Sequence, residues 1–198
     1  MPKIDHAGRK RLIVAESVRL FATRGYAQVN FGMIAKACGV ARTLLYKYFR
    51  NKRAIFNEAI DEVTDTVRAR YREVSATLAS ADQKLRQICI TVFALLFENR
   101  NFVCVISDVL SDYRRKGGSV PVERVIAHTS GLLRILQDLI AEGIRRGEFR
   151  REIDPVRAAN ILYSQYEAAA LRIAITGNAE FAVCIDEMET LLLALRAR

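Results

Sequence analysis

The stretch from Gly39 to Phe56, GVARTLLYKYFRNKRAIF, combines positive charge with aromatic rings and contains no acidic side chain. Its five cations are Arg42, Lys47, Arg50, Lys52 and Arg53, and they are interleaved with Tyr46, Tyr48 and Phe49. Guanidinium and ammonium groups bind phosphate oxygens, and a surface with no local counter-charge attracts a polyanion. The chemistry of this stretch is therefore expected to be the binding of a polyanionic partner.

The distribution of charge along the chain supports the same interpretation. Residues 1–60 hold 12 Lys and Arg against three acidic side chains, whereas residues 61–198 hold 19 of each sign. The whole formal net charge of +9 thus lies in the first third of the chain. A basic head on a neutral body is typical of proteins that bind nucleic acid or an acidic membrane surface.

Other classes of function find little support in the sequence. It contains no GxSxG, GxGxxG or P-loop motif, and its two histidines lie far apart, so neither an enzyme nor a metal or cofactor site is expected. The most apolar run, ICITVFALLF at residues 88–97, is too short to span a bilayer, and residues 1–16 do not resemble a secretory signal. The four separated cysteines are expected to be buried free thiols, and the protein is expected to be cytoplasmic.

Apolar residues recur at helical spacing almost throughout the chain, and no sustained period-2 alternation is present. We therefore predict an all-α fold of about nine helices. Asn30 is a suitable N-cap for the second helix, and Gly25 suits the left-handed end of the first. The predicted helices cover approximately residues 9–23, 31–37, 42–48, 52–79, 82–98, 101–116, 121–146, 155–176 and 179–197.

Residues 31–48 have the pattern of a helix-turn-helix, in which the key positions are Ala35, Gly39 and Leu45. A small residue is needed where the two helices cross, and Gly39 can supply the positive φ of a tight turn. If Leu45 points inward, then Arg42, Thr43 and Lys47 project outward from the third helix. Such a face can enter a major groove. A helix that binds a membrane surface would instead expose a large apolar face to lipid, whereas here the apolar residues hold the short helices together, so DNA is favoured as the partner.

Residues 8–60 resemble the DNA-binding domain of the tetracycline-repressor (TetR) family. The matching pieces are LFATRGY at 20–26, IAKACGV at 34–40 and LYKYFRNKRAIF at 45–56, and IAEGIRRGEFRREIDPVRAANIL at 140–162 resembles the family's regulatory domain more loosely. The resemblance implies a three-helix DNA-binding domain over residues 1–55. A fourth helix would join it to a larger helical domain over 56–198 that binds an effector and dimerises.

The resemblance also implies DNA contacts at particular positions. Arg42, Thr43 and Lys47 match positions that touch bases, while Tyr46 and Tyr48 match aromatic positions that touch phosphates or bases. Lys52 matches a phosphate contact at the start of the fourth helix, and Asn30 matches a capping residue that can donate to phosphate. Leu44 departs from the usual Thr or Ser and is expected to meet a thymine methyl group, whereas Ala41 replaces the usual capping Ser.

The body is expected to hold a mostly apolar effector. The helices around residues 88–97 and 102–110 are apolar on nearly all sides, as expected for buried or cavity-lining helices. From the region that surrounds the effector in the family, the candidate ligand-binding residues are Phe93, Phe97, Cys104, Tyr113, Leu136 and Tyr166. Aromatic residues at helical spacing are also what a plain core would contain, and that alternative stays open for each of them.

The last two predicted helices are expected to form a homodimer contact through Ala158, Ile161, Leu162, Ala169, Leu191, Leu192 and Leu195. The alternative is a monomer in which these helices fold back on the body. A twofold arrangement would place two DNA-binding heads about one helical turn of DNA apart. The sequence thus predicts a one-component transcriptional regulator, expected to repress, that binds a pseudo-palindromic operator as a dimer and is released by a small lipophilic effector. The alternative is a ligand-binding helical protein that no longer binds DNA.

Overall fold

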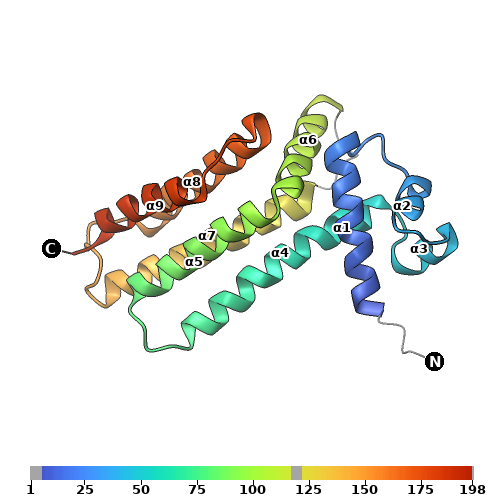
Figure 1. Cartoon of the computed structure of the whole chain (residues 1–198). Helices are drawn as coiled ribbons and strands as arrows, with labels where there is room; N and C mark the ends of the chain where they lie inside the picture. Colours follow the sequence, from blue (N-terminus) through green and yellow to red (C-terminus); the bar gives the residue numbers. More distant parts are fainter. Residues whose placement is uncertain (1–5, 117–121, 198) are drawn as a thin grey trace. The chain divides into compact units, whose positions relative to one another are not determined.

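The computed structural model describes residues 6–116 and 122–197, apart from the side chains of residues 112, 115 and 116. This part of the chain forms nine α-helices and no β-strand, as the sequence predicted (Figure 1). The helices are α1 (His6–Arg24), α2 (Phe31–Ala37), α3 (Arg42–Tyr48), α4 (Lys52–Ser75), α5 (Ala81–Glu98), α6 (Arg100–Lys116), α7 (Val122–Arg145), α8 (Pro155–Thr176) and α9 (Phe181–Leu195). Their ends lie within a few residues of the predicted ones, and the predicted start of α7 at position 121 lies outside the described residues.

The chain divides into two compact units that do not follow the order of the sequence. The first unit is Met1–Glu62 with Asn101–Val125, and the second is Val63–Arg100 with Ile126–Arg198. The helix α4 begins in the first unit and ends in the second. The predicted division of the chain into two domains after residue 55 remains a prediction. The two compact units are divided differently, because the first unit also contains Asn101–Val125.

The short helices of the first unit begin and end where local chemistry dictates. The side chain of Asn30 accepts a hydrogen bond from the Met33 amide at 3.1 Å and so caps α2, as predicted. Gly39 has the expected positive φ of 64°, and its neighbour Val40 donates its amide to the Ala35 carbonyl at 3.0 Å. This closes the turn that separates α2 from α3.

A shared apolar core holds these helices together. The side chains of Phe21, Ile34, Leu45, Ile55 and Phe56 are fully buried. Burying each of them contributes about 1.5–3 kcal/mol relative to leaving it in water. In Figure 1, α1, α2 and α3 gather accordingly around the first turns of α4.

In the second unit, α5 packs against α8 and α9, and α8 and α9 run side by side (Figure 1). Gly143 in α7 lies against the Phe149 ring, where an added Cβ would come within 2.2 Å of a ring carbon, so only glycine fits. Beyond that contact, the Arg150 amide donates to the Leu195 carbonyl at 3.0 Å. The α7–α8 connection is thereby tied to the end of α9.

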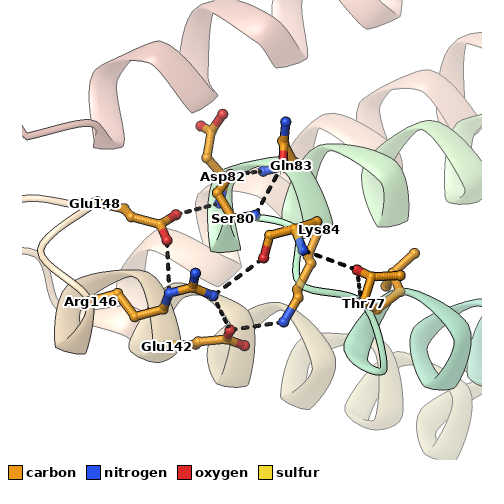
Figure 2. Close-up of polar contacts among 10 residues, drawn as sticks. Thr77, Ser80, Asp82, Gln83, Lys84, Glu142, Arg146 and Glu148 are labelled. Atoms are coloured by element: carbon orange, nitrogen blue, oxygen red, sulfur yellow. Dashed lines mark hydrogen bonds and ion pairs between the residues drawn. The ribbon is translucent and has the colours of Figure 1, made fainter.

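A polar network crosses the same end of this unit (Figure 2). The ammonium of Lys84, which is only 5% exposed, donates to the Glu142 carboxylate at 3.0 Å. Arg146 contacts both Glu142, at 2.9 Å, and Glu148, at 3.0 Å, and Glu148 also accepts from the Asp82 amide at 3.1 Å. Burial alone would raise the pKa of Glu142, but the hydrogen bonds from Lys84 and Arg146 outweigh it and lower that pKa. Glu142 therefore supplies the opposite charge that the buried Lys84 ammonium requires.

The predicted dimer contact on α8 and α9 is wrong for most of its residues. Ala158, Leu162, Ala169, Leu192 and Leu195 are buried inside their own unit, because α8 and α9 turn these residues toward the rest of that unit. Ile161, by contrast, is 54% exposed. The apolar side chains that α8 and α9 leave on the surface are Val156, Ile161, Leu171, Ile175, Phe181, Val183 and Leu193.

Within the described residues, no three His, Cys, Asp or Glu side chains are grouped as metal ligands. No single helix there is long and apolar enough to cross a membrane, although Ala81–Glu98 and Arg100–Ser111 meet that length and composition when taken together across their bend. All four cysteines are free, as predicted, but only Cys89 and Cys184 are buried, whereas Cys38 and Cys104 are half-buried.

His128 joins α4 to α7 within the second unit. Its Nδ1 lies 2.8 Å from the Thr64 hydroxyl. Burial, and secondarily the Arg68 guanidinium, lower the pKa of His128 below its usual 6.5. The fold thus favours the neutral imidazole, because a charged ring would be poorly solvated beside another cation.

This gives a pH-dependent prediction. Because the unfolded chain takes up the His128 proton at a higher pH than the folded chain does, the free energy of unfolding should fall as pH drops below 6.5 and level off below the folded-state pKa. In His128→Asn this part of the loss should disappear, so its melting temperature should fall less than that of the wild type between about pH 7.5 and about pH 5. Equal losses in both proteins would contradict the assignment.

Candidate nucleic-acid interface

The outward face of α3 carries the residues that the sequence singled out. Leu45 is fully buried and Phe49 is 4% exposed, so the helix has one face fixed in the core. Arg42, Thr43 and Lys47 are exposed on its other faces, and Leu44 is half-buried. Inward anchoring of Leu45 is the condition on which the predicted DNA-reading face depended, and the structure meets it.

Within the described residues, the cations of α3 have no acidic counter-ion. Among the described residues, no acidic side chain pairs with Arg42 or Lys47, whereas Arg53 pairs with Glu123 at 3.3 Å and Lys10 pairs with Glu58. An exposed cation that has no acidic partner keeps its net charge available to phosphate and base acceptors. The cations of the first unit that have no acidic partner among the described residues thus include Arg42 and Lys47, which lie on the face that would enter the major groove.

Tyr46 is held in place by two neighbours. Its ring stacks on that of Phe31 in α2, with centroids 4.9 Å apart and planes at 19°. Its hydroxyl accepts a hydrogen bond from the Arg42 guanidinium at 3.3 Å, and that guanidinium also lies 5.7 Å from the ring centroid. Half of the Tyr46 side chain remains exposed, so it can support Arg42 and still meet a ligand.

Tyr48 and Lys52 are both engaged inside the unit. The Tyr48 hydroxyl lies 3.0 Å from Nδ1 of His6 at the start of α1. The Lys52 ammonium donates to three backbone carbonyls of the segment between α1 and α2, and burial lowers its pKa. Ala41, at the N-cap of α3, makes no side-chain capping bond, in keeping with its difference from the usual Ser.

The structure brings the eight candidate DNA-contacting residues onto α3, the N-cap of α2 and the first residue of α4. Their contacts with DNA remain predictions. Sequence reasoning missed the support that Phe31 gives to Tyr46 and that His6 gives to Tyr48. An aromatic residue at position 31 gave no such signal, because the stacking depends on how α2 crosses α3.

Three of the six candidate ligand-binding residues converge in the second unit. Phe93, Leu136 and Tyr166 line a small apolar cavity of about 10 Å³ together with Cys89, Val92, Leu132, Leu162, Tyr163 and Met188. Phe97 instead packs edge-on against Phe181, with centroids 5.5 Å apart. Cys104 is half-buried and Tyr113 is 43% exposed, and both belong to the first unit.

The hydroxyls around this cavity differ in their bonding. Tyr163 and Thr129 pair through their hydroxyls at 2.9 Å. The Tyr166 ring packs against Phe93 and Tyr163, and burial raises the pKa of Tyr166 well above its usual value of 10.0. The cavity is thus an apolar chamber with phenol groups in its wall, and in this form it has room for about one water molecule.

Comparisons with known proteins match this architecture. Residues 13–59 match the family model described as "Bacterial regulatory proteins, tetR family". The fatty acid metabolism regulator protein of Bacillus subtilis is 28% identical over 151 residues, which cover 76% of each chain. The transcriptional repressor KstR2 of Mycolicibacterium smegmatis is 22% identical over 148 residues, 75% of this chain and 71% of that protein.

Solved structures share the fold over nearly the whole chain. KstR2 of Mycobacterium tuberculosis, described as a ketosteroid transcriptional regulator, superposes with a TM-score of 0.75 at 17% identity and covers 99% of this chain and 98% of its own. FadR of Bacillus subtilis in complex with stearoyl-CoA superposes with a TM-score of 0.76 at 22% identity, over 94% of this chain and 99% of its own.

The anchored α3, whose cations lack an acidic partner among the described residues, and the family match over residues 13–59 define a helix-turn-helix DNA-binding protein. More particularly, residues 13–59 match the DNA-binding domain of the TetR family, and the chain is similar to transcriptional regulators over about three quarters of its length.

The exposed face of α3 generates a prediction about specificity. Arg42→Ala should weaken binding to the specific site by about 1–3 kcal/mol and relax discrimination at one base position, because a guanidinium reads bases bidentately. Affinity should be measured by fluorescence anisotropy on specific and scrambled duplexes at one salt concentration. Arg50→Ala is the matched control, since Arg50 is exposed just beyond α3. Equal losses on both duplexes for Arg42→Ala would show that Arg42 contacts only the backbone.

Proposed function

We propose that this regulator represses transcription by binding a pseudo-palindromic operator as a homodimer, and that a small lipophilic effector releases it. The observation that carries the proposal is the DNA-reading face of α3, with Leu45 buried and Arg42 and Lys47 exposed and unpaired within the described residues. Repression agrees with the name of one similar protein, the repressor KstR2. We place this activity in the cytoplasm, because the operator DNA lies there.

A dimer is supported by the surface of α8 and α9. Ile161, Leu171 and Ile175 are 54%, 57% and 71% exposed, and they lie near one face of α8. Apolar groups gathered on one surface are stabilised by covering them, and a twofold axis allows the same patch on two copies to cover itself. Two heads held in this way would read two half-sites of one operator.

The effector is proposed to bind where Phe93, Leu136 and Tyr166 meet. The lining of that cavity is almost wholly apolar, which suits a fatty-acyl or steroid-like molecule better than a sugar or nucleotide. Two similar proteins carry names that point the same way, a fatty acid metabolism regulator and a ketosteroid regulator. The protein is proposed to act by binding alone, without catalysis.

The size of the cavity has a consequence for mechanism. A space of about 10 Å³ cannot hold a fatty-acyl chain, so the effector must bind a form in which α5, α7, α8 and α9 stand further apart. A ligand that binds only the expanded form shifts the population toward it. If the expanded form binds the operator less well, the effector and the operator weaken each other by the same factor. Because α4 is continuous from Lys52 to Ser75, it can carry such a change to the head.

A binding titration tests the proposal. The full chain should bind a labelled duplex from the region upstream of its own gene at least ~10³-fold more tightly than a scrambled duplex at physiological salt. Stearoyl-CoA is the first effector probe, and it should release the specific complex. Leu136→Phe, which fills the cavity, should raise the stearoyl-CoA concentration for half release about tenfold, which is about 1.4 kcal/mol. The operator affinity of this variant should stay unchanged.

The matched control is Ile126→Phe, a similar enlargement on the same helix at a side chain that is 59% exposed and away from the cavity lining. Stearoyl-CoA should release this variant from the specific duplex at the same concentration at which it releases the wild-type protein. Binding to neither duplex at low salt would favour the alternative, a ligand-binding protein that no longer binds DNA. Specific binding that stearoyl-CoA and a steroid probe both leave intact would contradict the effector proposal and leave the DNA proposal standing.

A further inference from the structure

Lys52, the first residue of α4, is bound to the backbone of the segment between α1 and α2. Its Nζ donates to the carbonyl oxygens of Tyr26, Ala27 and Val29 at 2.7, 3.0 and 3.0 Å. It also lies 4.7 Å from the centroid of the Tyr26 ring. A protonated lysine has three N–H donors, so all of them are used by these carbonyls.

The segment it holds is short of other hydrogen bonds. Carbonyls just beyond a helix end have no helical partner and need a donor from elsewhere. The Gln28 amide donates to the Gly25 carbonyl at 3.2 Å and closes a turn, but the carbonyls of residues 26, 27 and 29 point to Lys52. The ammonium thus supplies in one place the donors that a strand or helix would otherwise supply.

The held segment leads directly to the DNA-reading face. Val29 is 1% exposed and precedes Asn30, the N-cap of α2. Phe31 follows and stacks on Tyr46, whose hydroxyl accepts a hydrogen bond from Arg42. A displacement of residues 26–29 would therefore move Phe31, and with it the surface on which Tyr46 and Arg42 rest.

The other side of the held segment is equally constrained. The Tyr26 ring packs edge-on between Phe21 and Phe56, with centroids at 5.0 and 5.6 Å. Both phenylalanines are fully buried. Lys52 therefore connects the Tyr26 ring, which is packed in the core, to the residues just before α2. This connection requires the Lys52 ammonium group to point into the unit.

From this geometry we propose that Lys52 is a positioning residue for the DNA-reading face, acting by binding the 26–29 carbonyls rather than by neutralising a phosphate. The proposal replaces the phosphate contact expected from the sequence, and it rests on the proposed DNA-binding function only for its effect on operator affinity. Arginine cannot take the same role, because its donors lie in a plane and diverge, whereas the three carbonyls converge on one atom.

Two measurements on the full chain test the proposal, with Lys52→Met, Lys52→Arg and the control Lys47→Met. In the free protein, hydrogen exchange of the amides of residues 26–33 should be at least about tenfold faster in both Lys52 variants, since they lose the carbonyl contacts. It should be unchanged in Lys47→Met, which makes the same chemical change on an exposed side chain. Specific DNA binding should weaken in both Lys52 variants.

The salt dependence of binding separates the two roles of a lysine. Each phosphate contact contributes about 0.9 to the slope of log K against log salt, so Lys52→Met should keep the wild-type slope if Lys52 only positions the face. A slope lowered by about 0.9 with wild-type hydrogen exchange would overturn the proposal. Recovery of wild-type exchange and affinity in Lys52→Arg would overturn it as well, because charge alone would then suffice.

If Lys52→Met proves unfolded, the exchange of residues 26–33 in Lys52→Arg decides: fast exchange supports the proposal and wild-type exchange contradicts it. Failure of the wild-type chain to bind any operator would contradict the proposed function instead. The exchange measurement on the free protein would still decide the role of Lys52.

Discussion

The proposed DNA-reading face of α3 depends on the burial of a few side chains in helices that are too short to be stable alone. The helices α2 and α3 have seven residues each, and isolated helices of that length do not persist in water. Ile34 and Leu45, both fully buried, hold them against the rest of the first unit. Because Leu45 faces inward, the opposite side of α3 faces solvent, and the positions of Arg42 and Lys47 follow from that one constraint.

Charge then decides what this surface can bind. A cation that pairs with an acidic neighbour, as Arg53 does with Glu123, has part of its charge neutralised within the protein. Arg42 and Lys47 have no such partner among the described residues, and Lys52 is bound to backbone carbonyls. The basic residues of the first unit thus divide into those that hold the fold and those that remain available to a polyanion. Net charge alone cannot show this division, because it counts both kinds equally.

Local signals allowed much of the fold to be predicted from the sequence. The bounds of α2 and α3 agreed because Asn30 and Gly39 act through their own backbone and nearest neighbours. The stacking of Phe31 on Tyr46 and the binding of Lys52 to residues 26–29 could not be predicted, since both join segments whose approach depends on tertiary packing. Most of the predicted dimer residues on α8 and α9 are buried within their own unit for a related reason, because helical spacing shows that a helix has an apolar side but not which partner covers it.

A hydroxyl-radical footprint of the wild-type chain on its operator would test the central claim most directly. Two α3 helices inserted in successive major grooves should protect two half-sites whose centres lie about 10 base pairs apart on one face of the duplex, and methylation of guanine N7 within them should block binding. Uniform protection without half-sites, or binding that N7 methylation leaves unaffected, would contradict the account, because α3 would then not be reading bases in the major groove.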